Sequence, residues 1–138
     1  MVKKLERVQP PSEEPVSLEE VKKHLNVDYI HDDNLIMSYI VAAREYAEEY
    51  TRRSFVTQVW KAYGYDIQAL PRPPVQEILL VADGCITYRA GYGSAQDVPG
   101  PIKEAIKAIV SDLYDGQSFG PGHELAHRLL ATYRVMRI

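Results

Sequence analysis

Five residues near the C-terminal end of the chain, HELAH from His123 to His127, match the pattern H-E-x-x-H. On a helix this spacing places two histidines one turn apart, where their imidazoles can bind Zn²⁺. The glutamate between them, Glu124, would then act as general base on the metal-bound water. Taken alone, the motif predicts a zinc peptidase, and the rest of the sequence tests that hypothesis.

The surroundings of the motif do not supply a third zinc ligand. A catalytic zinc ion normally takes three protein ligands and a water molecule. In the extended form of the motif a glycine and a third histidine follow, and those positions hold Leu130 and Tyr133. No histidine, aspartate or glutamate follows His127. The ligand would have to come from elsewhere in the chain, which the motif does not imply.

An amphipathic last helix explains the same residues without a metal. In this interpretation Leu125 and Leu129 face the core, while His123, Glu124 and His127 lie in solvent. No serine lies in a nucleophile-elbow pattern, and no glycine motif has the context that binds phosphate. The sequence therefore predicts no catalytic, cofactor-binding or metal-binding residue and no enzyme. A zinc metallopeptidase stays as an alternative hypothesis.

The composition is typical of an ordinary globular protein of one domain. The chain has 138 residues, of which 46% are hydrophobic and 25% are charged. Its net charge of −3 argues against a dedicated nucleic-acid binder, which usually carries a strongly basic face. Both ends of the chain are nevertheless net positive, and the middle is acidic. A small DNA-binding module that uses the basic ends is a second alternative.

Cysteine usage and the first residues indicate a cytosolic site of synthesis. The single cysteine, Cys85, cannot form an internal disulfide and excludes a multi-cysteine zinc site. The first 15 residues contain no apolar segment of the kind found in signal peptides. No apolar run approaches the roughly 18 residues of a membrane span. We therefore expect a protein that is made or assembled in a cytosol, with no membrane association.

Hydrophobic periodicity predicts a mainly α fold. Ser17 and Glu20 form a capping box at a helix start, Pro101 suits the first turn of another helix, and Asp83-Gly84 is typical of a hairpin turn. We expect a bundle of four helices, over residues 17–25, 33–53, 101–114 and 123–131. A small β-hairpin or short sheet is expected between residues 55 and 92, with EILLV as a short buried strand. Residues 1–16 should form a flexible arm, and 17–138 a single domain with a tail over 132–138.

The long helix over 33–53 has a clear apolar stripe. Its core face is predicted to include Ile36, Ala43 and Ala47, and its solvated face to hold Arg44, Glu45, Glu48 and Glu49. Met37 and Val41 lie one turn apart outside this stripe. They either widen the buried face or contact another subunit, and widening is the simpler interpretation.

Several stretches, taken in order, resemble the head–tail connector proteins of tailed phages, also called head-completion or DNA-packaging adaptor proteins. They are PVSLEEVKKHLNVD, the helix ending AAREYAEEYTRRSF, the strand QVW, the turn LPRPPV, the segment AGYG with a later VP, the helix start PIKEAIK, and the tail LLATYRVMRI. Each piece is a common helix or turn pattern, but the ordered set is specific. The resemblance covers the chain from about residue 15 to its end.

The resemblance implies a structural virion protein of the phage neck. Such a protein would form a ring, commonly about twelve-fold, beneath the portal protein. The ring would extend the DNA channel and give the stopper or tail-completion protein a place to attach, and DNA would pass through without sequence-specific binding. The source would be an active phage or a prophage.

Family members place the long helix and the C-terminal tail in assembly contacts. On that basis we expect an interface with other subunits or partners at nine residues. They are Met37, Val41, Glu45, Arg52, Arg53, Tyr133, Arg134, Val135 and Met136.

Overall fold

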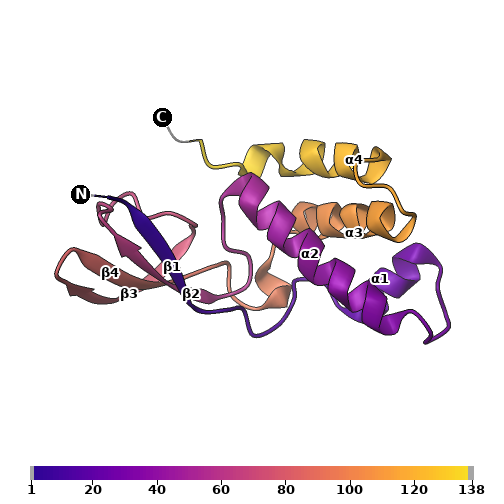
Figure 1. The fold of residues 1–138 in the computed structure, drawn as a ribbon, viewed down its shortest axis with the longest axis horizontal. Coiled ribbons are helices and arrows are strands. Elements are labelled where there is room, and N and C mark those ends of the chain that lie inside the picture. The colour runs from indigo at the N-terminus through magenta and orange to yellow at the C-terminus, as the bar shows by residue number, and fades with distance from the viewer. Residues whose placement is uncertain (1, 137–138) are drawn as a thin grey trace. The chain divides into compact units, whose positions relative to one another are not determined.

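A computed structural model describes residues 2–136 of the chain (Figure 1). These residues form four α-helices, two short 3-10 helices and a four-stranded antiparallel sheet, and 43% of them are helical and 21% in strands. The fold is therefore mixed α/β, and the prediction of a mainly α protein is wrong in this respect. The four predicted helices are all present. The sheet is larger than predicted, because the N-terminal segment contributes a fourth strand.

The chain divides into two compact units. The sheet unit comprises Met1–Glu13 and Arg52–Val98, and the helical unit comprises Glu14–Thr51 and Pro99–Ile138. Each unit is thus built from two separate stretches of sequence. The expectation of one domain over residues 17–138 stays a prediction.

The helical unit contains all four α-helices. They are α1 (Leu18–Leu25), α2 (Asp33–Thr51), α3 (Gly100–Tyr114) and α4 (Pro121–Leu130), followed by the short 3-10 helix η2 (Ala131–Tyr133). The capping box at α1 is confirmed, because the Ser17 hydroxyl accepts from the Glu20 N–H at 3.1 Å and Glu20 Oε1 accepts from the Ser17 N–H at 3.3 Å. Side chains of α3 such as Ile102, Ile106 and Ile109 are buried, as their periodicity predicts.

A buried arginine lies on the part of α2 that was expected to be solvated. Both Arg44 and Glu48 are buried, so this prediction is wrong for these two residues. The Arg44 guanidinium donates to both carboxylate oxygens of Glu14, at 3.0 and 3.2 Å, and to Glu48 Oε1 at 3.1 Å. Burial by itself lowers the pKa of Arg44, but the two carboxylates raise it above its ordinary value. The pairing makes burial tolerable and fixes the segment that enters α1 against α2.

The sheet unit contains strands β1 (Lys4–Gln9), β2 (Gln58–Tyr63), β3 (Val75–Ala82) and β4 (Cys85–Ala90), and the 3-10 helix η1 (Ala95–Asp97). The spatial order is β1-β2-β4-β3, and every neighbouring pair is antiparallel. The turn between β3 and β4 is Asp83-Gly84, with φ of 50° and 74°, which confirms the predicted hairpin. One face of the sheet carries a hydrophobic cluster, which consists of Trp60, Ala62, Leu70, Ile86, Tyr88 and Ala90.

Strand β1 lies within the segment that was predicted to be a flexible arm. The structure places Lys4–Gln9 in a ladder with β2 instead, with Leu5 packed against the hydrophobic cluster. The Arg7 guanidinium lies 4.8 Å from the centre of the Trp60 ring. Charged residues occupy half of this strand, and it lacks the regular alternation that identifies strands in sequence. Its order depends on a partner about fifty residues away in the chain.

Helices α3 and α4 approach each other closely at Gly122. A Cβ added to Gly122 would collide with the backbone carbonyl oxygen of Ala108 and would lie 2.7 Å from Oδ1 of Asp112. Figure 1 shows the two helices side by side, α3 in orange and α4 in yellow. The absence of a side chain at Gly122 is therefore what lets α4 lie against α3.

We expect Gly122→Ala to destabilise the protein by about 1–3 kcal/mol, because the added methyl group must displace backbone rather than a flexible side chain. Helix propensity alone predicts the opposite effect, because alanine is favoured over glycine in a helix by about 1 kcal/mol. Urea denaturation followed by circular dichroism measures it. Arg128→Ala is the control, since Arg128 is exposed on the same helix, and it should change stability by no more than about 0.5 kcal/mol. Equal stability of Gly122→Ala and wild type would contradict the packing described above.

Candidate functional site

The face of α4 that points inward is not the one expected from sequence. His123 is only 3% exposed, and Ala126 and Leu130 are fully buried, whereas Leu125 is 44% exposed. The prediction of a core face through Leu125 and a solvated His123 is therefore wrong. The helix is rotated so that the HELAH histidines lie toward the helical unit rather than away from it.

The buried carboxylate of Asp112, on α3, determines this rotation. It accepts hydrogen bonds from the backbone N–H groups of Gly120 at 3.0 Å, Gly122 at 2.9 Å and His123 at 2.7 Å. The ring Nδ1 of His123 lies 2.6 Å from the same carboxylate. The first N–H groups of a helix have no partners within it, and the N-cap residue of α4 is Gly120, which has no side chain to cap them. Asp112 thus caps α4 from a neighbouring helix.

The titration of Asp112 reflects this arrangement. Burial alone would raise the pKa of its carboxyl group. The hydrogen bonds from the His123 side chain and from the three backbone N–H groups outweigh burial and lower the pKa below its ordinary value. The ionised carboxylate also has favourable electrostatics beside the positive end of the α4 dipole.

His127 belongs to an aromatic cluster, which we define as Tyr46, Tyr50, Phe119, His123 and His127. Its Nε2 lies 2.7 Å from the Tyr46 hydroxyl oxygen, and its ring is stacked on Tyr50 with ring centres 4.5 Å apart. The ring of Phe119 is stacked on His123 at 4.9 Å. Both histidines of the motif therefore contribute to packing between α4, α2 and the α3–α4 loop.

The same contacts bear on the zinc hypothesis. Nδ1 of His123 is held by Asp112, and Nε2 of His127 is held by Tyr46. Within residues 2–136, the structure contains no group of three or more histidine, cysteine, aspartate or glutamate side chains arranged to bind a metal ion. The i, i+4 spacing of the histidines serves packing in this structure.

Of the predicted interface residues on α2, Met37 is 52% exposed, and Val41 and Glu45 are also exposed. The simpler interpretation, in which Met37 and Val41 widen the buried face, is therefore wrong. Arg52 directly follows α2, has a left-handed φ of 60° and belongs with Arg53 to the sheet unit. A role for these five residues in an interface stays a prediction.

The predicted tail residues lie beside the end of α2. The N–H of Val135 donates to the carbonyl of Thr51 at 2.9 Å, and the Arg134 guanidinium lies 4.9 Å from the centre of the Tyr50 ring. Tyr133 ends η2, and Met136 is largely exposed. Arg137 and Ile138, also part of the predicted tail, lie outside the described residues. The backbone hydrogen bond of Val135 and the contact of Arg134 with Tyr50 hold these residues beside α2.

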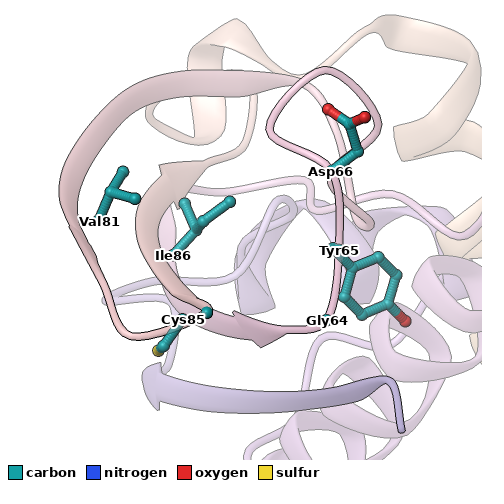
Figure 2. A pocket seen from close by; sticks show the side chains of 7 residues that line it. Gly64, Tyr65, Asp66, Val81, Cys85 and Ile86 are labelled. Carbon is teal, nitrogen blue, oxygen red and sulfur yellow. The ribbon is translucent and has the colours of Figure 1, made fainter. Parts of the chain in front are cut away.

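Strand β3 exposes an apolar surface that was not predicted from the sequence. EILLV was expected to be a buried strand, because an unbroken aliphatic run favours burial on both faces. In the structure every residue of Val75–Ala82 is exposed, including Leu80 at 60% and Val81 at 58%. A hollow of about 430 Å³ lies beside this strand, lined by residues such as Tyr65, Val81 and Ile86 (Figure 2). The sheet unit therefore exposes aliphatic side chains next to a recess.

The family of the protein is shown by its sequence. The model of the Phage gp6-like head-tail connector protein family matches residues 15–119, and the chain belongs to this family. The family consists of structural virion proteins of the head–tail junction and not of enzymes. The recognition of a head–tail connector from sequence is confirmed, and the zinc peptidase and DNA-binding alternatives receive no support.

Solved structures from gene transfer agent (GTA) particles share the fold. A chain in the neck of the empty GTA particle, computed with C6 symmetry, superposes with a TM-score of 0.76 at 18% identity, covering 98% of this chain and 97% of that one. A chain in the neck of the native particle, computed with C12 symmetry, gives 0.72 at 19% identity and the same coverage. No curated protein sequence matches the chain. None of the helices within residues 2–136 is long and apolar enough to cross a membrane.

We expect Asp112→Asn to destabilise the protein by about 2 kcal/mol or more, because an amide group cannot accept from all four donors that meet at this carboxylate. Asp115→Asn, at an exposed position just after α3, is the matched control and should have little effect. Since the pKa of Asp112 is lowered in the folded state, its contribution is present above about pH 4 and is lost as the pH falls through the lowered value. The difference between the two variants should therefore shrink in acid, and an unchanged difference from pH 7 to pH 3 would contradict this assignment.

We expect His127 to make stability depend on pH between about 5 and 7. Burial lowers the pKa of His127, as do the charges of His123 and Arg134, so the unfolded chain takes up a proton more readily than the folded one. Stability should then fall as the pH drops from 7.5 to 5.5. His127→Gln should reduce this fall, whereas the control His24→Gln, at an exposed histidine, should leave it unchanged. Equal pH dependence of wild type and His127→Gln in chemical denaturation would refute the prediction.

Proposed function

We propose that this chain is a structural subunit of the neck of a phage-like particle, where copies of it form a ring beneath the portal. The observation that carries the proposal is the family match over residues 15–119, together with a fold that is shared along nearly the whole chain with proteins of GTA necks. The ring extends the DNA channel and offers a surface for the stopper or tail-completion protein. Its location is the virion neck, reached by assembly in the host cytoplasm.

A ring of about twelve copies is supported by the C12 symmetry of one similar neck structure. Such a ring needs a heterologous interface, in which two different surfaces of the subunit meet and the rotation closes. Exposed apolar side chains occur on both units, with Met37 and Val41 on α2 and the aliphatic residues on β3. Apolar groups of this kind in a soluble protein mark surfaces that a partner covers.

The contacts with other proteins are proposed at the nine residues named from the sequence. On α2 the exposed side chains of Met37, Val41 and Glu45 present an apolar stripe with a charged end. In the tail, Val135 and Met136 supply apolar groups beside Arg134. In this proposal the exposed Met136 side chain near the end of the tail contacts the portal or the stopper.

The relation to DNA is passive in this proposal. The chain has a net charge of −3, and its middle part is acidic. An acidic channel wall repels phosphate groups and lets the duplex slide without sequence-specific contacts. DNA packaging thus requires the ring as a conduit and seal only.

The test is assembly with the portal of the same particle. We expect wild-type subunits to form rings, alone at high concentration or on the portal, as measured by mass photometry and negative-stain imaging. Met37→Asp should weaken ring or portal association at least about tenfold, because it places a charge on the proposed apolar contact. Ala42→Asp adds the same charge at another exposed position of α2 and should have a smaller effect. A wild-type subunit that stays monomeric and never binds the portal would overturn the proposed function.

A further inference from the structure

The two edges of the sheet are chemically different. Strand β3 forms one edge, and among residues 2–136 no strand is paired with it on the side away from β4. Sheet edges are usually protected by lysine, proline or short length. Strand β3 has eight residues, neither lysine nor proline, and the exposed aliphatic side chains Ile78, Leu79, Leu80 and Val81. This edge therefore has the properties of one that is covered in the assembled state.

Strand β1 forms the opposite edge and could provide that cover. It carries Lys4, Glu6 and Arg7, and its apolar residue Leu5 packs against the hydrophobic cluster of the sheet. The strand is net positive, whereas the charged residues of β3 and its turn are both acidic, Glu77 and Asp83. Charge therefore favours a contact between unlike edges over a contact between two β1 edges.

Strand directions make such a contact repeatable. Because all neighbouring strands are antiparallel in the order β1-β2-β4-β3, the two edge strands run in opposite directions. When two copies have the same orientation, β3 of one copy and β1 of the next are antiparallel, as in the rest of the sheet. A contact between two β3 strands would instead join two copies about a twofold axis and end there.

The faces of the two strands also correspond. Ile78 and Val81 are paired with Tyr88 and Ile86, so they lie on the face of the hydrophobic cluster. In β1, Leu5 occupies that same face at the other edge. A neighbouring β1 would thus place its Leu5 beside Ile78 and Val81, next to the hollow shown in Figure 2. The cluster would continue from one subunit to the next.

We propose that β3 of one copy packs against β1 of the next copy, so that the sheets join edge to edge around the ring. The proposal rests on the proposed ring function and specifies its heterologous interface. Two irregularities of the β3 ladder, between Val75 and Glu77 and between Ile78 and Leu80, leave Leu80–Ala82 as its regular end. The contact is therefore centred on the part of β3 nearest the turn.

Cysteine cross-linking in assembled rings tests the proposal directly. In a Cys85→Ser background, subunits carrying Leu80→Cys are mixed with subunits carrying Glu6→Cys and treated with a short bismaleimide. Both positions lie on the face of the sheet opposite the hydrophobic cluster. We expect dimers that contain one subunit of each kind, and a ladder of multimers when one chain carries both changes. Links only between two Leu80→Cys subunits, or no links in intact rings, would overturn the proposal.

A matched pair of variants tests the energetic role of the edge. Leu80→Asp should raise the concentration needed for ring assembly at least about tenfold, because it puts a charge on the covered strand. Ile67→Asp makes the same change at an exposed aliphatic residue outside the strands and should assemble like wild type. If Leu80→Asp also assembles like wild type, the edge contact is wrong while the ring stands. If wild type forms no ring and does not bind the portal, the proposed function and this interface fail together.

Discussion

The arrangement of the helical unit depends on one buried carboxylate. Asp112 accepts hydrogen bonds from three backbone N–H groups at the start of α4 and contacts the ring of His123. The start of a helix is where backbone N–H groups have no partner within the helix. Because these bonds fix the position of the first turn, Gly122 can lie against the backbone of α3 and His123 is directed inward. The stacking of His127 on Tyr50 and the path of the tail beside α2 follow from that placement.

This arrangement also explains why a zinc motif occurs in a protein of a structural family. Two histidines one turn apart on a helix can bind a metal, but the same spacing places two planar, hydrogen-bonding rings on one buried face. In this protein each ring has a protein partner, an aspartate for one and a tyrosine hydroxyl for the other. The motif stabilises the packing of α4, and His127, whose pKa is lowered by burial, lies beside the segment proposed to contact other neck proteins.

In the sheet unit, one edge strand is charged and the other exposes aliphatic side chains. Its hydrophobic cluster is covered at one edge by β1, whose charged residues keep that edge soluble. At the other edge, β3 leaves aliphatic side chains exposed, which reduces the solubility of a free subunit and favours association. A closed ring needs two unlike surfaces on each subunit, and in the proposed interface these are the two opposite edges of the sheet.

The sequence by itself determined the features that depend on neighbouring residues. The capping box at Ser17, the proline at the start of α3, the Asp83-Gly84 turn and the existence of four helices are all local, and the ordered set of segments was enough to identify the family. Only the tertiary structure decided which face of α4 is buried, that Arg44 and Glu48 are buried as a pair, that β1 is ordered, and that β3 is exposed. These outcomes depend on groups outside the segment itself, such as Asp112 on α3 for His123, Glu14 for Arg44 and β2 for β1. Periodicity reports how a segment can bury its own side chains, but it carries no information about which distant group satisfies a polar atom or covers an edge.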